Sequence, residues 1–152
     1  MIYKCSNGRR LIIATKESLV SALDKSGLVP CVVLLTAWQV ERASVSFWEP
    51  SIRFLLENRC SYFACVGNYS ERLHDAIDEF LYQYDEEIGS QLSRDIVTTY
   101  HNNESTEDVI AYFVHGTELR SANGCLVAIL DDSLLEDQGI MNFIKTHEAQ
   151  PA

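Results

Sequence analysis

Only seven glycines occur in this 152-residue chain, and none of them builds a phosphate-binding loop. A dinucleotide site needs a G-x-G-x-x-G turn after an early strand, but Ala14-Thr-Lys-Glu17 follows the first long apolar run. Neither G-x-x-x-x-G-K-[ST] nor G-x-S-x-G is found, which argues against P-loop nucleotide chemistry and against an α/β-hydrolase. A phospho-acceptor receiver domain would place acidic residues where Thr15 and Gly67-Asn68 stand.

Basic residues are also scarce. Twelve Lys and Arg face twenty-two Asp and Glu, which gives a formal net charge of −10. Such a surface repels nucleic acid and anionic lipid, so we expect neither as a partner. No apolar run approaches the ~20 residues of a membrane span, and the N-terminus lacks a secretory signal pattern. The sequence therefore predicts a cytoplasmic protein with no membrane association.

Cysteine spacing excludes the common zinc sites. The five cysteines form no C-x-x-C pair, and their number is odd. Four of them lie in or beside apolar runs, where a free cysteine acts as a small buried hydrophobe. We expect no structural zinc and no cofactor.

Five apolar runs of strand-like composition punctuate the chain, and stretches with helical spacing separate them. The spacing predicts a single domain over 1–152, an α/β fold with a three-layer doubly wound (flavodoxin/Rossmann-like) sheet of about five mostly parallel strands. The predicted strands cover residues 11–14, 31–36, 61–66, 96–100 and 125–130.

Several local signals predict where elements begin and end. Pro50 favours a helix that starts near Trp48 or Glu49, with the proline in its first turn. Ser105 and Ser133 each precede an acidic residue by three positions, as in a capping box. Residues 1–14 are compatible with one strand or with a hairpin around Asn7-Gly8. From His147 onward the sequence predicts a frayed tail.

Polar residues follow the predicted strands, and in an open α/β sheet the carboxyl edge is where ligands bind. His101 beside an acidic residue is a candidate general base. Asp131-Asp132 would offer oxygen ligands to Mg²⁺, but an acidic helix entry explains them equally well, and we expect no metal. The candidate pocket consists of Trp38, Asn68, Tyr100, His101 and Asp131.

A second candidate site is an acidic surface that contains tyrosines. Tyrosine supplies contact area at low entropic cost, and carboxylates steer and pair with a basic partner. A helix end with solvated charges is the simpler interpretation of the same pattern. The candidate partner-binding residues are Tyr82, Tyr84, Asp85, Glu86, Glu87, Glu104, Glu107 and Asp108.

The middle half of the chain resembles a bacterial domain family of unknown function. In that family a Cys-x-Tyr strand ends in Trp-Gly, and a Thr-Thr-Trp-His corner precedes an acidic, aromatic helix. The resemblance rests on Trp48, on Asn58-Arg-Cys-Ser-Tyr-Phe-Ala-Cys-Val-Gly67, on Leu73-His-Asp-Ala-Ile-Asp78 and on Ile96-Val-Thr-Thr-Tyr-His-Asn-Asn-Glu104. Val66 and Tyr100 stand where the family carries tryptophan, and no catalytic role follows from the resemblance.

Size, acidity and the absence of catalytic motifs give a class-level likeness to bacterial immunity proteins, which neutralise toxins. The leading hypothesis is a non-enzymatic binding protein that masks a basic toxin. The alternative is a small-molecule sensor or an enzyme that acts at the carboxyl edge of the sheet around His101. The third possibility is a structural partner within a larger bacterial assembly, which a stable homodimer would favour.

Overall fold

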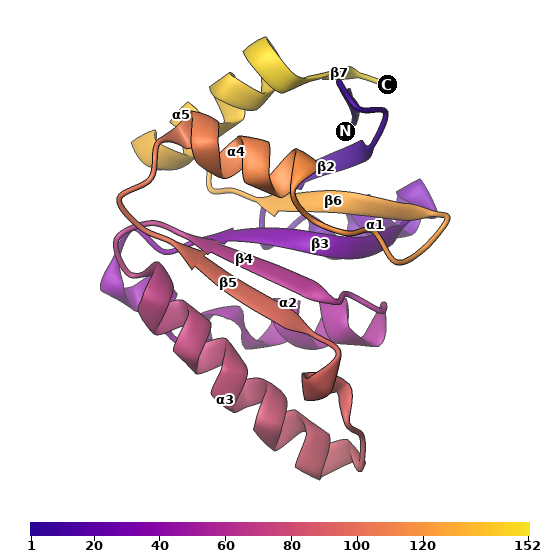
Figure 1. Ribbon diagram of the computed structural model, residues 1–152, viewed down its shortest axis with the longest axis vertical. Helices are drawn as coiled ribbons and strands as arrows, with labels where there is room; N and C mark the ends of the chain where they lie inside the picture. The colour runs from indigo at the N-terminus through magenta and orange to yellow at the C-terminus, as the bar shows by residue number, and fades with distance from the viewer.

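One mixed sheet of seven strands organises the computed structural model, which describes residues 1–152 (Figure 1). Five α-helices cover its two faces. The strands are β1 (Ile2–Cys5), β2 (Arg10–Ala14), β3 (Val29–Thr36), β4 (Tyr62–Val66), β5 (Val97–His101), β6 (Gly124–Ile129) and β7 (Ala149–Pro151). The helices are α1 (Leu19–Ser26), α2 (Val45–Glu57), α3 (Ser70–Ile88), α4 (Thr106–His115) and α5 (Leu135–Phe143), and short 3₁₀ turns η1 (Val40–Ala43) and η2 (Leu92–Arg94) precede α2 and β5.

The strand order is β5-β4-β3-β6-β2-β1-β7. The five strands from β5 to β2 are parallel, which confirms a mostly parallel α/β sheet. The detailed prediction was wrong in two respects. The sheet has seven strands instead of about five, and the order of its parallel strands is neither the flavodoxin nor the Rossmann order.

Both additional strands lie at the chain ends. Residues 1–14 form a β1–β2 hairpin, one of the two predicted alternatives, and Gly8 turns it with a φ of 86° that a side chain would disfavour. The prediction of a frayed tail was wrong, because β7 pairs antiparallel with β1. Ala149 is buried there, and this buried side chain holds the tail on the sheet.

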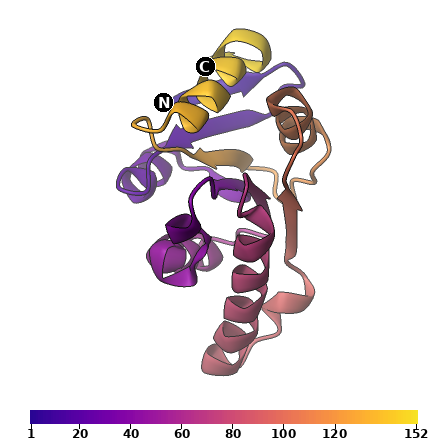
Figure 2. The ribbon, with the colours of Figure 1, turned by 90° about the vertical axis from the view of Figure 1, so that its left-hand side faces the viewer.

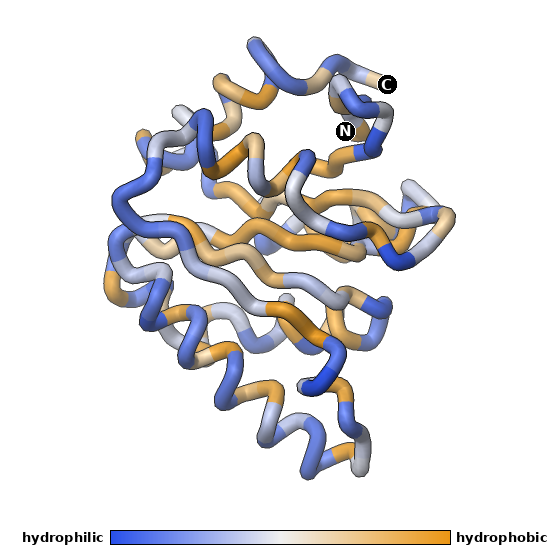
Figure 3. Tube along the Cα trace, in the orientation of Figure 1, coloured by the Kyte–Doolittle hydropathy of each residue, from blue (hydrophilic) through white to orange (hydrophobic).

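The central strands are apolar because helices cover them on both sides (Figure 3). Every residue of β6 is buried, and so is every residue of β3 after Val29. One core layer lies between the sheet and helices α1, α2 and α3. The other lies between the sheet and helices α4 and α5. All five cysteines are free and buried in these layers, which was predicted for all of them except Cys5, and burial raises the pKa of the Cys60 thiol to about 12.

Two helix starts differ from the prediction. Helix α2 begins at Val45, because the Ser44 hydroxyl accepts the Phe47 amide and caps it, and Pro50 therefore lies more than one turn inside. Pro50 has no N–H to donate to the carbonyl of residue 46. Because residue 46 is exposed, this carbonyl can bond water instead. The box at Ser133 does not form, because Ser133 donates both its amide and its hydroxyl to Asp131. The Ser105 cap on the Asp108 amide is confirmed.

None of the helices is both long enough and apolar enough to cross a membrane.

Removal of β7 tests the correction at the C-terminus. A chain that ends at Glu148 should lose about 1–3 kcal/mol of unfolding free energy, because it loses a buried residue and the strand hydrogen bonds to β1. Urea unfolding monitored by tryptophan fluorescence measures this. An unchanged midpoint would mean that the tail adds nothing to the sheet.

Candidate functional site

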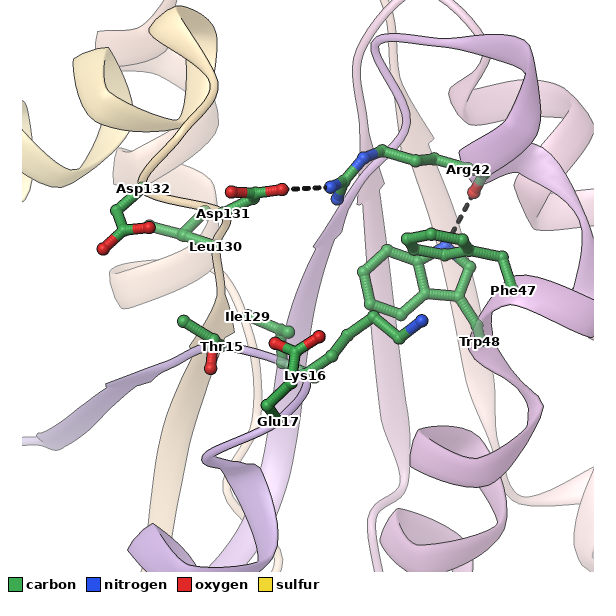
Figure 4. Close-up of a pocket in the computed structure, with 10 residues that line it drawn as sticks. All are labelled: Thr15, Lys16, Glu17, Arg42, Phe47, Trp48, Ile129, Leu130, Asp131 and Asp132. Carbon is green, nitrogen blue, oxygen red and sulfur yellow. Dashed lines mark hydrogen bonds and ion pairs between the residues drawn. The ribbon is translucent and has the colours of Figure 1, made fainter.

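A cavity of about 300 Å³ opens at the carboxyl ends of β2 and β6 (Figure 4). Strand β6 lies between β3 and β2 in the sheet. The helices that follow β2 and β3 pack on one face, whereas the helix that follows β6 packs on the other. Because the connections after neighbouring strands run to opposite faces, a crevice remains at the carboxyl ends of these strands. Such a crevice is the usual ligand site of an open α/β sheet. The turn before α2 and the start of α2 close the cavity.

Arg42 and Asp131 form an ion pair across the top of the cavity. An Arg42 guanidinium nitrogen lies 2.6 Å from a carboxylate oxygen of Asp131. The Arg42 backbone carbonyl accepts the indole N–H of the fully buried Trp48 at 2.6 Å, which fixes the turn that carries the arginine. Hydrogen bonds from the Ser133 hydroxyl and amide, together with Arg42, lower the pKa of the Asp131 carboxyl. Asp131 therefore carries its charge and holds Arg42 in place.

Behind this pair lies Asp137, a carboxylate with no exposed surface. It accepts hydrogen bonds from the Trp38 indole at 2.9 Å, the Thr36 hydroxyl at 3.1 Å and the Asp131 amide at 2.7 Å. Burial raises the pKa of the Asp137 carboxyl, and these hydrogen bonds and Arg42 offset part of the rise. The side chain links the end of β3, the end of β6 and the first turn of α5.

Unpaired charges of opposite sign lie at opposite ends of the cavity. The Lys16 ammonium lies 3.5 Å from the centre of the Phe47 ring and forms no ion pair. Asp132 lies at the other end, and Glu17 lies between them on the floor (Figure 4). Neither of these carboxylates has a hydrogen-bonding or ionic partner within the protein. The cavity therefore offers a cation and two carboxylates to a ligand.

The structure brings together only part of the pocket predicted from the sequence. Trp38 and Asp131 meet through Asp137. Asn68 is exposed after β4, and Tyr100 lies on the edge strand β5 with its ring 5.2 Å from that of His74. The cavity does not include these two residues.

His101, the candidate general base, lies at the end of β5 and away from the cavity. Its ring nitrogens contact the Glu104 carboxylate at 2.9 Å and the Thr99 hydroxyl at 3.1 Å. The ring packs 4.7 Å from Tyr112, and 9 % of the residue is exposed. His101 is thus bonded to a carboxylate, as a base would be, but no deep pocket surrounds it.

Sequence reasoning missed Lys16, Arg42 and Asp137. Lys16 follows a strand end directly, so its position could have identified it. Arg42 lies in a short 3₁₀ turn that the apolar pattern does not mark. Asp137 carries no signal, because an acidic residue in the first turn of a helix is ordinary on dipole grounds.

The predicted partner-binding residues on α3 divide into buried and exposed groups. Tyr84 is 7 % exposed and stacks on Phe80. Burial opposes ionisation of Asp85, but hydrogen bonds from Ser90, Ser93 and Leu92 lower its pKa to about 2. Tyr82 is 65 % exposed, and Glu86 lies exposed on the same helix. Tyr82 and Glu86 are therefore free to contact a partner, whereas Tyr84 and Asp85 are engaged within the protein.

The remaining partner-binding candidates lie at two helix ends. Glu87 pairs with Arg53 at 3.1 Å. Glu104 pairs with His101, while Glu107 and Asp108 are exposed in the first turn of α4. No group of three or more His, Cys, Asp and Glu side chains is arranged to hold a metal ion.

Replacement of Asp137 by asparagine tests its linking role. Asp137→Asn should lower the unfolding free energy by about 1–3 kcal/mol. The NH2 group of the asparagine would face N–H and O–H groups that are themselves hydrogen-bond donors, so these buried groups would lose an acceptor. Its exposed neighbour Glu136, changed to glutamine, is the matched control and should leave stability within about 0.5 kcal/mol of wild type. Chemical denaturation of both variants measures the difference. Equal stabilities would contradict the role assigned to Asp137.

Comparison with known proteins gives one match. No curated protein and no solved structure matches the chain. A profile of the family described as "Domain of unknown function (DUF7684)" matches residues 10–142. This range contains the whole cavity and Asp137, and it excludes β1 and β7. The resemblance to an uncharacterised domain family is therefore confirmed, over more of the chain than the middle half. The chain belongs to the DUF7684 family.

Proposed function

We propose that this protein binds a small zwitterion of the amino-acid type in the cavity between β2, β6 and α2. The observation that carries the proposal is the pair of unpartnered charges of opposite sign, Lys16 and Asp132, at its two ends. The proposal is for binding alone, without turnover of the ligand.

The chemistry of the two ends suits the two charges of the ligand. Asp132 and Glu17 can accept an ammonium group, and Lys16 can receive a carboxylate. Arg42 stays paired with Asp131, so this pair adds little net charge, and Lys16 is the cation left free for the ligand. The volume lies at the lower end of the range for ligand pockets, which favours a small molecule over a dinucleotide.

The apolar wall indicates the kind of side chain that fits. The Phe47 ring faces the cavity, and Ile129 at the end of β6 and Leu130 just after it also line it. An apolar substituent would contact these groups while the charged ends stay fixed. We therefore expect amino acids with apolar side chains to bind more tightly than charged ones.

Calorimetric titration with each of the common amino acids tests the proposal. The variants Lys16→Met and Asp132→Asn should each weaken the best ligand by about tenfold to a hundredfold, since a charged hydrogen bond contributes roughly 1.5–3 kcal/mol. Blocking the amino group by acetylation, or the carboxylate as an amide, should weaken binding to a similar extent.

Two exposed residues of α1 provide matched controls. Lys25→Met and Asp24→Asn make the same chemical changes away from the cavity and should leave affinity unchanged. Absence of heat with every amino acid at about 10 mM, or equal affinity in all four variants, would refute the proposal.

We propose as a second function that the protein binds a basic protein in the cytoplasm, with a basic toxin as the expected partner class. The supporting observation is the exposed face of α3, where Tyr82 lies among the exposed acidic residues Asp78, Glu79 and Glu86. The net charge of −10 adds long-range attraction to any basic surface. This function uses a surface remote from the cavity and is compatible with the first.

Charge reversal on α3 tests the second function. A partner captured by the wild-type protein and then purified should bind at least about tenfold more weakly to the Glu79→Lys, Glu86→Lys double variant, and binding should weaken from about 50 mM to about 300 mM salt. Glu118→Lys changes an exposed charge outside α3 and serves as control. A partner whose affinity ignores both salt and the double variant would argue against an electrostatic interface.

A further inference from the structure

Strand β5 forms an open edge of the sheet. It pairs with β4 on one side and with no strand on the other, and it lies at the margin of the molecule (Figure 2). The Val97 amide donates to the Ser61 carbonyl, and the His101 carbonyl accepts the Gly67 amide, so both of these residues point their backbone groups toward β4. Because backbone direction alternates along a strand, Thr98 and Tyr100 point their N–H and C=O groups outward.

The opposite edge of the same sheet is protected, and β5 is not. Strand β7 has three residues, and one of them is Pro151, which has no amide to donate. Strand β5 has five residues, Val-Thr-Thr-Tyr-His, with no proline, no lysine and no bulge. Tyr100 is 44 % exposed on it. An edge of this composition is able to pair with another strand.

Carboxylates border this edge on both faces of the sheet. On the α3 face, the His74 ring packs against Tyr100 and contacts Asp75 at 2.9 Å and Asp78 at 3.6 Å. On the α4 face, Glu104 contacts His101. A strand that pairs with β5 would thus have Asp75 and Asp78 on one face and Glu104 on the other. Its side chains would point alternately to these two faces.

These charges determine the sign of the occupant. A second copy of this chain would bring the same carboxylates against their own counterparts, on top of a repulsion between two net charges of −10. In a segment with Lys or Arg at alternate positions, all the cations point to one face of the sheet and pair with the carboxylates on that face. The exposed Tyr100 ring would receive one of them on its face.

We propose that β5 is a docking edge for an extended basic segment of a partner protein, which adds to the sheet as an eighth strand. Hydrogen bonds to the backbone of Thr98 and Tyr100 hold the segment, and Asp75, Asp78 and Glu104 select its charge. The inference deepens the second function above and rests on it for the basic character of the partner. It is independent of the cavity.

A synthetic peptide of alternating lysine and valine is the probe, and the same peptide with glutamate for lysine is its control. Thr98→Pro removes one outward amide without touching the pairing to β4, and should weaken the basic peptide at least about tenfold. Thr98→Ala keeps that amide and removes a buried hydroxyl that has no hydrogen-bond partner, so it should bind as wild type does. The acidic peptide should bind neither variant nor the wild-type protein.

Hydrogen exchange on the wild-type protein gives a readout that does not depend on the proline variant. Addition of the basic peptide should slow exchange of the Thr98 and Tyr100 amides at least about tenfold and leave that of the inward-facing Thr99 unchanged. Peptide N-methylated at alternate residues should lose both binding and protection. This comparison decides the question even if Thr98→Pro fails to fold.

The outcomes separate the inference from the function on which it rests. If the basic peptide binds wild type and Thr98→Pro equally, with protection on α3 instead of β5, the edge does not dock a strand, and the acidic-surface function remains. If the peptide does not bind and the protein sediments as a dimer that Thr98→Pro dissociates, the occupant is a second copy, and the inference is wrong. If the protein is a monomer and does not bind the peptide, the inference is also wrong. The charge-reversal variants of α3 then test the second function by itself.

Discussion

The buried carboxylate of Asp137 is the interaction on which the shape of the cavity depends. It binds one group from β3, one from the loop after it and one from the loop after β6, while its own backbone belongs to α5. A buried carboxylate is unfavourable unless donors surround it, so its three hydrogen bonds define a single arrangement of these elements. Asp131 takes part in this arrangement only through its backbone amide, so its carboxylate is free to bind Arg42. The position of Arg42, and with it the cavity, follows from the position of Asp137.

Charge is distributed unevenly over the molecule, and this separates the two proposed binding sites. The chain has few cations, yet Lys16 and Arg42 both line the cavity, together with the carboxylates of Glu17, Asp131 and Asp132. Elsewhere acidic residues dominate, along α3 and beside the edge strand. A ligand with both charges suits the cavity, and a segment with positive charge suits the edge. The two sites lie on different strands of one sheet, and occupation of one need not block the other.

Apolar patterning predicted the parallel core well, because strands covered on both faces must be apolar throughout, as β3 and β6 are. It failed for β1 and β7, which are short and partly polar and pair only because the chain ends meet in space. The pattern placed Asp131 correctly at the carboxyl ends of the strands. It could not give the strand order, however, so His101 and Asn68 were assigned to the same pocket as Asp131 although they lie elsewhere. Asp137 and Arg42 were not predictable, since their partners are distant in sequence and their own positions resemble ordinary helix and turn sites.

The indole N–H of Trp38 offers the most direct test of this account, because it reports on the bond to Asp137 without any substitution. Hydrogen exchange of this proton and of the Asp131 amide, followed by NMR, should be slow for both and should approach the rate set by global unfolding. Exchange of either proton at the rate of an exposed group would show that the carboxylate does not hold the two strand ends together, and would contradict the account.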